Sequence, residues 1–391
     1  MKVATCTPVN FEASPRFFSR DTGLLCRGFQ QAGIDCRVIM PGTAQEDDAA
    51  DLVRCSPAEL EDPLWWKTMG INLVVLYAWA NPKYLNIAKA IRAAGIHLIQ
   101  SVDTAALRSP YADLETWCQA TIAEIGMPQP LASRLRRLAR TGRDFIPALF
   151  DHRRVEMMAE CDALAAVSPP AMDSMADFAC ALGRPDVAKK MIVVPHPVSS
   201  EMTYGGEMKI DHVLVVGRWG KEDQTQKDPQ LTLKILEEFL AGEPNWTAEI
   251  IGPEATGLAA LTSDWKQEIK SRLTLTNFIP HAELRQCYAT SKISLCASRF
   301  ESFHIASAEA VCSGCSVVIA SHPNLVSTAW FTTRNSGTLA QSRKKKDLVE
   351  ALKTEATAWH SGNRQPTEIS AEWQNELHCN KIARAIADAN S

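Results

Sequence analysis

The sequence lacks the features that mark membrane-spanning, secreted and nucleic-acid-binding proteins. Its longest apolar run, residues 71–80, covers half of the ~20 residues that a transmembrane helix requires. The opening residues 3–6 are too few for the apolar core of a secretory signal peptide and are typical of a first β-strand. A net charge of −4 is opposite in sign to the basic excess of nucleic-acid binders. We therefore expect a cytoplasmic protein with reduced thiols and no nucleic-acid partner.

Cysteine pairs with the spacing of metal or redox sites are also scarce. Of the twelve cysteines, only Cys312 and Cys315 have that spacing, and no second pair has the spacing of metal ligands. Gly314, between them, is a typical helix stop, so we expect both thiols to be packing residues. Cysteines such as Cys6 and Cys296 lie in apolar strand patterns, where a thiol packs as a small hydrophobe.

The sequence does contain a repeated alternation of strand and helix patterns. A chain of 391 residues exceeds what one hydrophobic core usually serves, so two domains are the default. Continuously apolar, strand-like stretches, typical of a parallel sheet covered on both faces, occur at residues 2–7, 35–40, 72–77, 97–101, 163–168 and 191–194. Helical patterns fill the gaps and end at glycines. The first half is therefore predicted to be a doubly wound α/β domain.

Prolines, serines and glycines within residues 195–206 predict an interdomain linker. A second alternating run follows, with strands at 212–217, 247–252, 275–279 and 292–297 and helices at 229–241, 261–272, 282–290 and 345–359. A long amphipathic helix is predicted at 371–389. We thus predict one domain at residues 1–200, a second at 201–370, and a C-terminal helical segment at 371–391.

Residues 299–309 are the most informative segment. They place Glu301 and Glu309 eight positions apart across a strand-to-helix junction. Glu301 should lie in the turn above the strand, and Glu309 about two turns into the following helix, toward the same crevice. Such carboxylates suit sugar hydroxyls and a ribose diol. The N–H groups expected at the helix start, which suit a diphosphate, are those of Phe303, His304 and Ile305.

This arrangement resembles the E-x7-E signature of the retaining glycosyltransferases of family 4. Two adjoining segments extend the resemblance: residues 309–318 are similar to the family's "EAMAxGxPVV" element, and residues 277–284 with Tyr288 are similar to its "GxVxxxEL…Y" element. The resemblance implies the GT-B fold, in which two doubly wound Rossmann-like domains face a central cleft. It also implies that the C-terminal helix crosses back to the N-terminal domain.

The resemblance implies a donor site for a UDP- or GDP-linked sugar in the C-terminal domain. The family carries a G-R…K-G element whose cations hold the donor diphosphate; here Gly217 and Arg218 match it together with Lys227, while Lys221 is a rival because the spacing is longer than usual. A departing nucleoside diphosphate gains negative charge, which fixed cations stabilise. The donor-binding residues implied in this way are Gly217, Arg218, Lys227, Phe278, Ile279, Glu301, Phe303, His304, Ile305 and Glu309.

The same resemblance assigns the acceptor to the N-terminal domain. Asp103 follows a predicted strand at the position where many family members place a histidine that faces the donor sugar. Asp103 is therefore either a catalytic-site residue that bonds a sugar hydroxyl or the N-cap of a helix beginning at Ala105. The basic stretch from Arg134 to Arg154 is either a solvated helix face or a peripheral contact with anionic lipid or a lipid-linked acceptor.

The leading interpretation is a retaining glycosyltransferase that moves a sugar from a nucleotide-diphosphate sugar to a glycan, lipid-linked or small-molecule acceptor. The catalytic residues are expected to be Glu301, Arg218, Lys227 and Asp103. No metal or other cofactor is expected, since residues 46–48, the nearest match to a metal-binding DxD element, lie in a polar loop. Two alternatives remain: a nucleotide-sugar epimerase or phosphorylase-like enzyme on the same architecture, or an inactive GT-B partner subunit. Ser302 and His304, which replace both glycines of the family's "EGFG" turn, favour the inactive subunit.

Overall fold

The computed structural model describes residues 1–12, 15–19, 21–46, 48–102, 131–132, 135, 147–221 and 223–390. Most of the described residues fall into two compact units. The first unit contains residues 1–102, 147–200 and 376–390, and the second contains residues 201–375. None of the helices in the described residues is long and apolar enough to cross a membrane.

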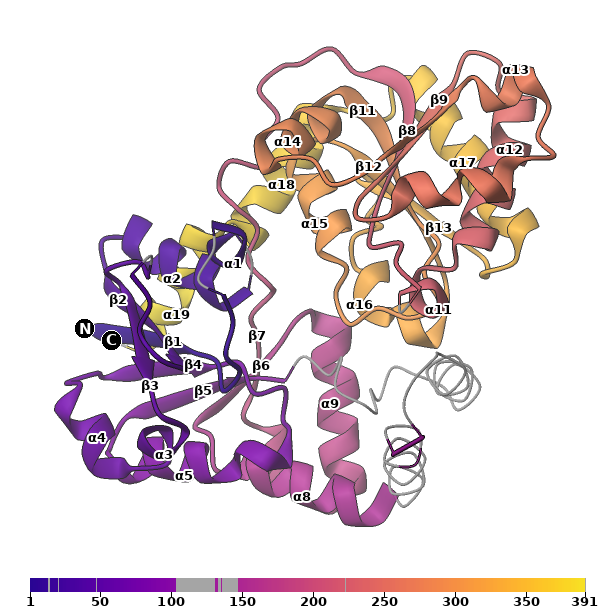
Figure 1. Ribbon diagram of the computed structural model, residues 1–391. Coiled ribbons are helices and arrows are strands. Elements are labelled where there is room, and N and C mark those ends of the chain that lie inside the picture. Colours follow the sequence, from indigo (N-terminus) through magenta and orange to yellow (C-terminus); the bar gives the residue numbers. More distant parts are fainter. Residues whose placement is uncertain are drawn as a thin grey trace. The chain divides into compact units, whose positions relative to one another are not determined.

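A parallel sheet of seven strands forms the centre of the first unit, in the order β3-β2-β1-β4-β5-β6-β7 (Figure 1). Its strands are β1 Lys2–Cys6, β2 Asp35–Pro41, β3 Leu52–Cys55, β4 Leu73–Leu76, β5 His97–Ser101, β6 Ala163–Ala166 and β7 Met191–Val193. Its helices are α1 Pro15–Phe18, α2 Asp21–Gln31, α3 Pro57–Leu60, α4 Pro63–Thr68, η1 Pro82–Tyr84, α5 Leu85–Ala93, α8 Pro147–Ala159, α9 Pro169–Ala181, α10 Pro185–Ala188 and α19 Cys379–Asp388. Sequence analysis missed only β3 among these strands, because the run is only four residues long and is interrupted by the charged Arg54.

The second unit contains a parallel sheet of six strands in the order β10-β9-β8-β11-β12-β13. Its strands are β8 Ile210–Val216, β9 Thr247–Ile251, β10 Leu273–Thr276, β11 Ser291–Cys296, β12 Ser316–Ala320 and β13 Gly337–Ala340. Its helices are α11 Gln224–Lys227, α12 Pro229–Gly242, η2 Ala255–Thr262, α13 Gln267–Lys270, α14 His281–Thr290, α15 Ile305–Cys312, η3 Pro323–Leu325, α16 Val326–Ala329 and α17 Lys345–His360, and α18 Pro366–Leu377 begins in this unit. The predicted α/β class with two doubly wound, Rossmann-like domains is confirmed.

Buried apolar residues on both sheets explain why these elements pack. Burying one Leu, Ile or Val side chain stabilises a fold by about 1.5–3 kcal/mol. In the first unit the strand residues Val38 and Val75 share a cluster with Phe29 of α2 and Ile382 of α19. Gly28 permits this packing, because a Cβ atom there would lie 2.3 Å from the carbonyl oxygen of Cys379.

The C-terminal segment differs from its prediction, because residues 371–389 do not form one helix. α18 ends at Leu377 and α19 begins at Cys379. Between them, His378 has an extended backbone and forms an isolated bridge with Val198. The N–H of Val198 donates to Leu377 (2.8 Å), and the N–H of Cys379 donates to Val198 (2.9 Å). These backbone bonds to the linker replace helical ones, so a contact between distant residues interrupts a helical pattern.

Two further elements of the second unit differ from their predictions. The expected helix at 261–272 is divided into the 3₁₀ helix η2 and the single turn α13. The hydroxyl of Thr262 donates to the backbone carbonyl of Ala259, a local bond that competes with helix formation. The strand expected at 275–279 begins and ends earlier, as β10, so Phe278 and Ile279 lie in the loop before α14.

Each sheet has one switch point, a strand to which the chain adds further strands first on one side and then on the other. In the first unit β2 pairs with one side of β1 and β4 with the other, and in the second unit β9 and β11 flank β8 in the same way. Open α/β sheets bind ligands outside the carboxyl ends of the strands at such switch points. The fold therefore offers two candidate locations, one above β1 and β4 and one above β8 and β11.

The loop above β4 has an unusual backbone. Trp79 and Ala80 have φ values of 53° and 49°, and the N–H of Asn81 donates to the carbonyl of Ala78 at 2.9 Å. Left-handed φ values cost about 1–2 kcal/mol for each residue that carries a Cβ atom. The surrounding fold of the first unit therefore holds a strained turn at its switch point.

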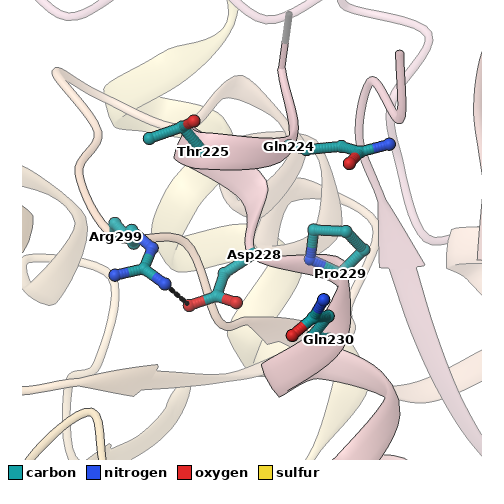
Figure 2. Close-up of a pocket in the computed structure, with 6 residues that line it drawn as sticks. All are labelled: Gln224, Thr225, Asp228, Pro229, Gln230 and Arg299. Atoms are coloured by element: carbon teal, nitrogen blue, oxygen red, sulfur yellow. Dashed lines mark ion pairs between the residues drawn. The ribbon is translucent and has the colours of Figure 1, made fainter. Parts of the chain in front are cut away.

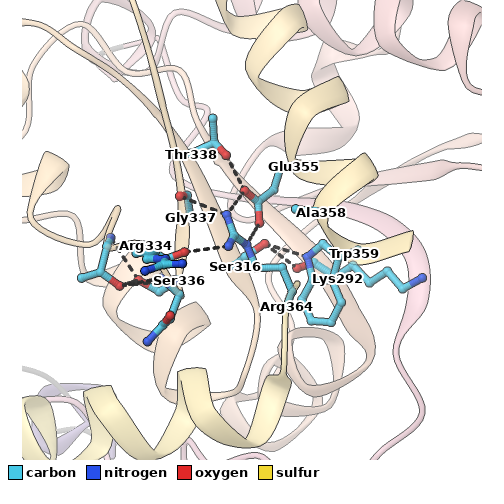
Figure 3. A network of polar contacts seen from close by, with 12 residues as sticks. Lys292, Ser316, Arg334, Ser336, Gly337, Thr338, Glu355, Ala358, Trp359 and Arg364 are labelled. Carbon is cyan, nitrogen blue, oxygen red and sulfur yellow. Dashed lines mark hydrogen bonds and ion pairs between the residues drawn. The ribbon is translucent and has the colours of Figure 1, made fainter. Parts of the chain in front are cut away.

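A buried ion pair fastens α17 to the edge of the second sheet (Figure 3). Glu355 is fully buried, and both of its carboxylate oxygens accept bonds from Arg364, at 2.5 and 2.8 Å. The hydroxyl of Thr338 on β13 donates to the same carboxylate at 2.5 Å. Arg364 also donates to the carbonyls of Arg334 and Gly337, so every charged group in this cluster has several partners.

We expect Glu355→Ala to lower the free energy of unfolding by about 3–5 kcal/mol, because Arg364 would be left buried without its carboxylate. The matched control is Glu238→Ala, which removes an exposed ion pair with Lys345 that also joins α12 to α17. An exposed pair contributes about 0–1 kcal/mol. Urea denaturation of both variants measures the difference, and equal losses would show that the buried pair adds no stability.

Candidate functional site

The first part of the candidate site follows β8. Gly217 leaves the strand, and its N–H donates to the carbonyl of Ile251 on β9 at 3.0 Å. Gly252 has a φ of 138°, and a Cβ atom there would lie 1.8 Å from the carbonyl oxygen of Gly217. The two strand ends can approach this closely only because position 252 is a glycine. Arg218 then extends from the edge with 55% of its side chain exposed and pairs with Asp223 at 2.9 Å.

The longer spacing between Arg218 and Lys227 is explained by the short helix α11, which ends at Lys227. Asp228 follows with a left-handed backbone and serves as the N-cap of α12, with Pro229 in the first turn. Its carboxylate accepts from Leu231 N–H and pairs with Arg299 and Arg343, at 3.0 and 2.9 Å. These bonds fix the backbone beside Lys227.

The second part of the site is the turn between β11 and α15. The N–H of Glu301 donates to the carbonyl of Asn324 at 3.0 Å, and the N–H of Arg299 donates to the carbonyl of Gln226 at 2.7 Å. The amide of Gln226 donates to Phe300 (3.2 Å) and to the Glu301 carboxylate (3.1 Å). The turn is therefore joined to α11 through both backbone and side-chain bonds.

Lys227 and Glu301 form the central contact of the site. Lys227 Nζ lies 2.5 Å from Glu301 Oε1, and only 11% and 7% of the two side chains are exposed. Burial by itself would raise the pKa of Glu301, but attraction to Lys227, with hydrogen bonds from Lys227 and Ser298, holds that pKa below its ordinary value. Glu301 is therefore a carboxylate at neutral pH. The structure brings together two residues that sequence analysis assigned to one site.

His304 occupies the position where the helix α15 begins. It has a φ of 71°, so its backbone is left-handed although it carries a side chain. Its ring is buried, with Nδ1 2.7 Å from the Ser307 hydroxyl and Nε2 4.0 Å from Glu301 Oε1. Burial lowers the pKa of His304 to about 4, against a smaller opposing effect of Glu301. The imidazole is therefore neutral and is held beside the carboxylate by the helix start.

Cys296, Glu301 and His304 form the group with metal-ligand potential in the described part of the chain. Their ligand atoms lie within 4.8 Å of one another, and all three residues are buried. Burial, with the nearby Glu301 charge, raises the pKa of Cys296 to about 11, so it is a thiol rather than a thiolate. Lys227 already places a positive charge against the only carboxylate of this group.

Glu309 has a different set of partners. The helix α15 begins at Ile305, so Glu309 lies about one turn into it rather than two. The phenol of Tyr288 donates to its carboxylate at 3.2 Å, and His281 Nε2 lies 3.6 Å from it. The Glu309 carboxylate raises the pKa of His281, and burial raises that of Tyr288. Glu301 and Glu309 thus belong to adjoining groups and share no partner in the contacts of the described residues.

The remaining residues that sequence analysis assigned to the site differ in position and burial. Phe278 is 63% exposed and Ile279 is half-buried, both before α14. The Phe303 ring is fully buried against Phe331, with centroids 5.2 Å apart, so its side chain supports the turn from below. Ile305 is the first residue of α15, where N–H groups have no intrahelical acceptor. Asp103 lies outside the described residues.

The basic stretch falls mostly outside the described residues as well. Arg153 and Arg154 are described, on α8. Arg153 is exposed, but Arg154 is 1% exposed and therefore does not belong to a basic surface. The interpretation of residues 134–154 as one exposed basic face is wrong at Arg154, because helical periodicity turns this residue toward the interior.

A hollow of about 250 Å³ is lined by residues of α11 and the start of α12 (Figure 2). Its lining includes Gln224, Thr225 and Arg299, and Figure 2 shows the Arg299 guanidinium directed at Asp228. Neither Lys227 nor a glutamate of the site lines it. Sequence analysis missed Gln226, Asp228 and Arg299; only Asp228 had a recognisable signal, an N-cap residue directly before a proline.

Comparison with known proteins places these residues in context. A family model described as "Glycosyl transferases group 1" matches residues 211–355. No curated protein matches the sequence significantly.

Solved structures match over the full chain. A lipopolysaccharide outer core galactosyltransferase, WaaB, in its apo form, matches at 15% identity with a TM-score of 0.63, covering 100% of this chain and 99% of its own. HepE from Anabaena in complex with UDP matches at 14% and 0.65, covering 100% and 99%. Sucrose-phosphate synthase from Thermosynechococcus elongatus matches at 13% and 0.61, covering 100% and 98%. At these identities the likeness shows the fold, that of GT-B glycosyltransferases.

The buried His304 makes stability depend on pH. Its pKa is lowered to about 4 in the folded state, against about 6.5 in an unfolded chain, so only the unfolded chain binds a proton between these values. The stability contribution is fully present above pH 6.5 and is lost as the pH falls toward 4. At about 1.4 kcal/mol per pKa unit, the loss is on the order of 3 kcal/mol.

We therefore expect His304→Asn to flatten the fall in unfolding free energy between pH 6.5 and 4, because asparagine tolerates the left-handed backbone without titrating. Urea denaturation at a series of pH values measures this. The control His152→Asn, which replaces an exposed histidine on α8, should keep the wild-type dependence. An unchanged slope in His304→Asn would contradict the burial of a neutral imidazole.

Proposed function

We propose that this protein is a glycosyltransferase that takes a sugar from a nucleotide-diphosphate sugar bound to the second unit. The single observation that carries the proposal is the buried Lys227–Glu301 pair above β8 and β11. This is the switch point where an open α/β sheet binds its ligand. The family match over residues 211–355 includes the whole of this site, and neighbours such as HepE were solved with UDP.

The chemistry of the pair fits a leaving nucleoside diphosphate. When the bond between the sugar and the β-phosphate breaks, negative charge accumulates on the phosphate oxygens, and a nearby ammonium stabilises that charge. Lys227 is held in place before the reaction by Glu301, so little reorganisation is needed. Arg218, more exposed on the same edge, supplies a second cation with a planar fork of donors suited to phosphate.

Glu301 is suited to a sugar hydroxyl. A carboxylate offers about four lone-pair sites, and Lys227, Gln226 and Ser298 donate to it. One acceptor position therefore remains for a ligand hydroxyl. Because Glu301 is ionised and buried, a hydroxyl that donates to it forms a charge-assisted bond, which is stronger than a neutral one.

The finer features of the proposal follow from the resemblance to retaining glycosyltransferases of family 4. The donor carries UDP or GDP, Glu309 holds the ribose diol, and the reaction retains the anomeric configuration without a metal or other cofactor. The departing β-phosphate then helps to remove the acceptor proton, which agrees with a site whose histidine is neutral, buried and bonded to Ser307. The acceptor, a glycan, a lipid-linked sugar or a small molecule, is assigned to the first unit.

Lys227→Ala and Arg218→Ala should each lower kcat/KM by roughly 10²–10³, the range for removing one charge-stabilising donor. The assay is release of UDP or GDP from a set of nucleotide sugars, using variants whose circular dichroism matches the wild type. Lys221→Ala, which removes an exposed lysine of the same loop, is the matched control and should be nearly silent. A large loss at Lys221 with none at Lys227 would reverse the assignment.

Glu309→Gln should weaken UDP or GDP binding about tenfold or more. The hydroxyls of the ribose diol would then donate to a neutral amide oxygen instead of a charged carboxylate. Glutamine keeps an oxygen that can accept from Tyr288, so the packing of α15 is preserved. Isothermal titration calorimetry with each nucleotide measures the change. The control is Glu283→Gln on the neighbouring α14, an exposed position. If Glu309→Gln binds both nucleotides like the wild type, Glu309 has no role in the donor site.

A further inference from the structure

The first unit has a switch point that the donor chemistry leaves unused. β1 and β4 pair side by side, with Cys6 opposite Leu76, and the N–H of Tyr77 continues the ladder by donating to Cys6 at 2.8 Å. Residues 78–81 form the turn that follows β4. All the described residues assigned to the donor lie in the second unit. The position above β1 and β4 is therefore a second place where this architecture binds a ligand.

The turn at this position has a backbone that its residues do not favour. Trp79 and Ala80 both have left-handed φ values, and Asn81 N–H closes the turn on the Ala78 carbonyl. Positive φ at both central positions is the pattern of a type I′ turn, which normally selects Asn-Gly or Gly-Gly. A tryptophan with this φ is an outlier. Strained backbone of this kind concentrates at ligand-binding sites, where the side chain displayed matters more than the turn itself.

The strained turn leaves one side chain, that of Trp79, partly exposed. Ala78 and Ala80 are fully buried, whereas Trp79 between them is only partly buried. Within the described residues no hydrogen bond and no ring contact is recorded for its indole, unlike Trp66, whose N–H donates to Leu60, or Trp373, whose ring packs on Trp330. The turn therefore holds an indole face and an N–H donor at the ligand-binding edge of the sheet.

The surroundings at the same edge are aromatic and polar. The ring of Tyr77 stacks on His196, with centroids 6.4 Å apart, and His196 Nδ1 lies 3.7 Å from Asp21 Oδ1. Thr7 is buried at the end of β1. A pyranose has apolar C–H faces and hydroxyl edges, so an indole face beside polar groups fits it better than it fits a hydrocarbon chain.

We propose that the 78–81 turn is a carbohydrate-binding platform in the first unit, on which the Trp79 indole stacks against a pyranose ring of the acceptor. This inference rests on the proposed function only where it identifies the bound sugar as the acceptor. Its physical content, a sugar-binding indole at the first switch point, is independent of the donor site.

The test uses three full-length variants. Trp79→Asn removes the indole and suits the left-handed backbone, Trp79→Phe keeps an aromatic face, and Trp65→Asn removes a half-buried tryptophan of α4 as the matched control. The probes are the methyl glycosides of glucose, galactose, mannose and N-acetylglucosamine. Binding is measured without donor by saturation-transfer NMR, and transfer by release of UDP or GDP from nucleotide sugars.

We expect at least one methyl glycoside to bind the wild type. In Trp79→Asn its saturation transfer should fall and its KM should rise about tenfold, as for loss of an aromatic contact. Trp79→Phe should lose less, and Trp65→Asn nothing. The KM for the nucleotide sugar and the acceptor-free hydrolysis rate should not change in Trp79→Asn, whereas a merely structural tryptophan would alter them together with the melting temperature.

The platform would be overturned by no saturation transfer to any methyl glycoside in the wild type, or by equal transfer in the wild type and Trp79→Asn. A KM that depends on the alkyl chain of octyl glycosides and not on Trp79 would favour a hydrocarbon ligand and also overturn it. If no nucleotide binds while glycosides still bind in a Trp79-dependent way, the proposed function fails and the platform stands.

Discussion

The architecture of the second unit's site depends on one ion pair, that between Lys227 and Glu301. The two charged atoms are 2.5 Å apart and almost entirely removed from water. Neither charge would be tolerated there alone, because an unpaired buried charge costs several kcal/mol. The pair therefore fixes the end of α11 against the turn that starts α15, and the bonds of Gln226 to Phe300 and Glu301 strengthen the same junction. Removing either partner would disturb the fold and the chemistry together, which is why variants need a check of folding.

The charged and titratable residues around the Lys227–Glu301 pair do not compete with it. Asp228, one residue after Lys227, is held by Arg299 and Arg343 and does not compete for the ammonium. His304 stays neutral, because burial opposes its protonation, so it adds no second cation beside Glu301. The Lys227 ammonium has three N–H donors, so a diphosphate arriving at this edge can accept from it while its bond to Glu301 persists.

Sequence patterns predicted most of the fold because its strands are continuously apolar and its helices amphipathic, which are local properties. The resemblance also assigned Glu301, Glu309 and Arg218 to the donor site, and these assignments stay predictions. Sequence patterns left Lys227 and Lys221 in competition, because the contact that distinguishes Lys227, its bond to Glu301, joins residues 74 positions apart. The break at His378 has the same cause, since Val198 forms the competing backbone bonds. The left-handed turn at Trp79 and Ala80 could not be predicted from local sequence, because no glycine or asparagine occupies either of its central positions.

The most direct test of the account is amide hydrogen exchange of the full chain with and without saturating UDP or GDP. If the switch point above β8 and β11 holds the nucleotide, protection should increase in residues 217–228 and 300–309. The strands of the first unit, including β1 and β4, should exchange at unchanged rates. Protection confined to the first unit, or no protection at nucleotide concentrations that saturate a glycosyltransferase, would contradict the assignment of the donor site to Lys227 and Glu301.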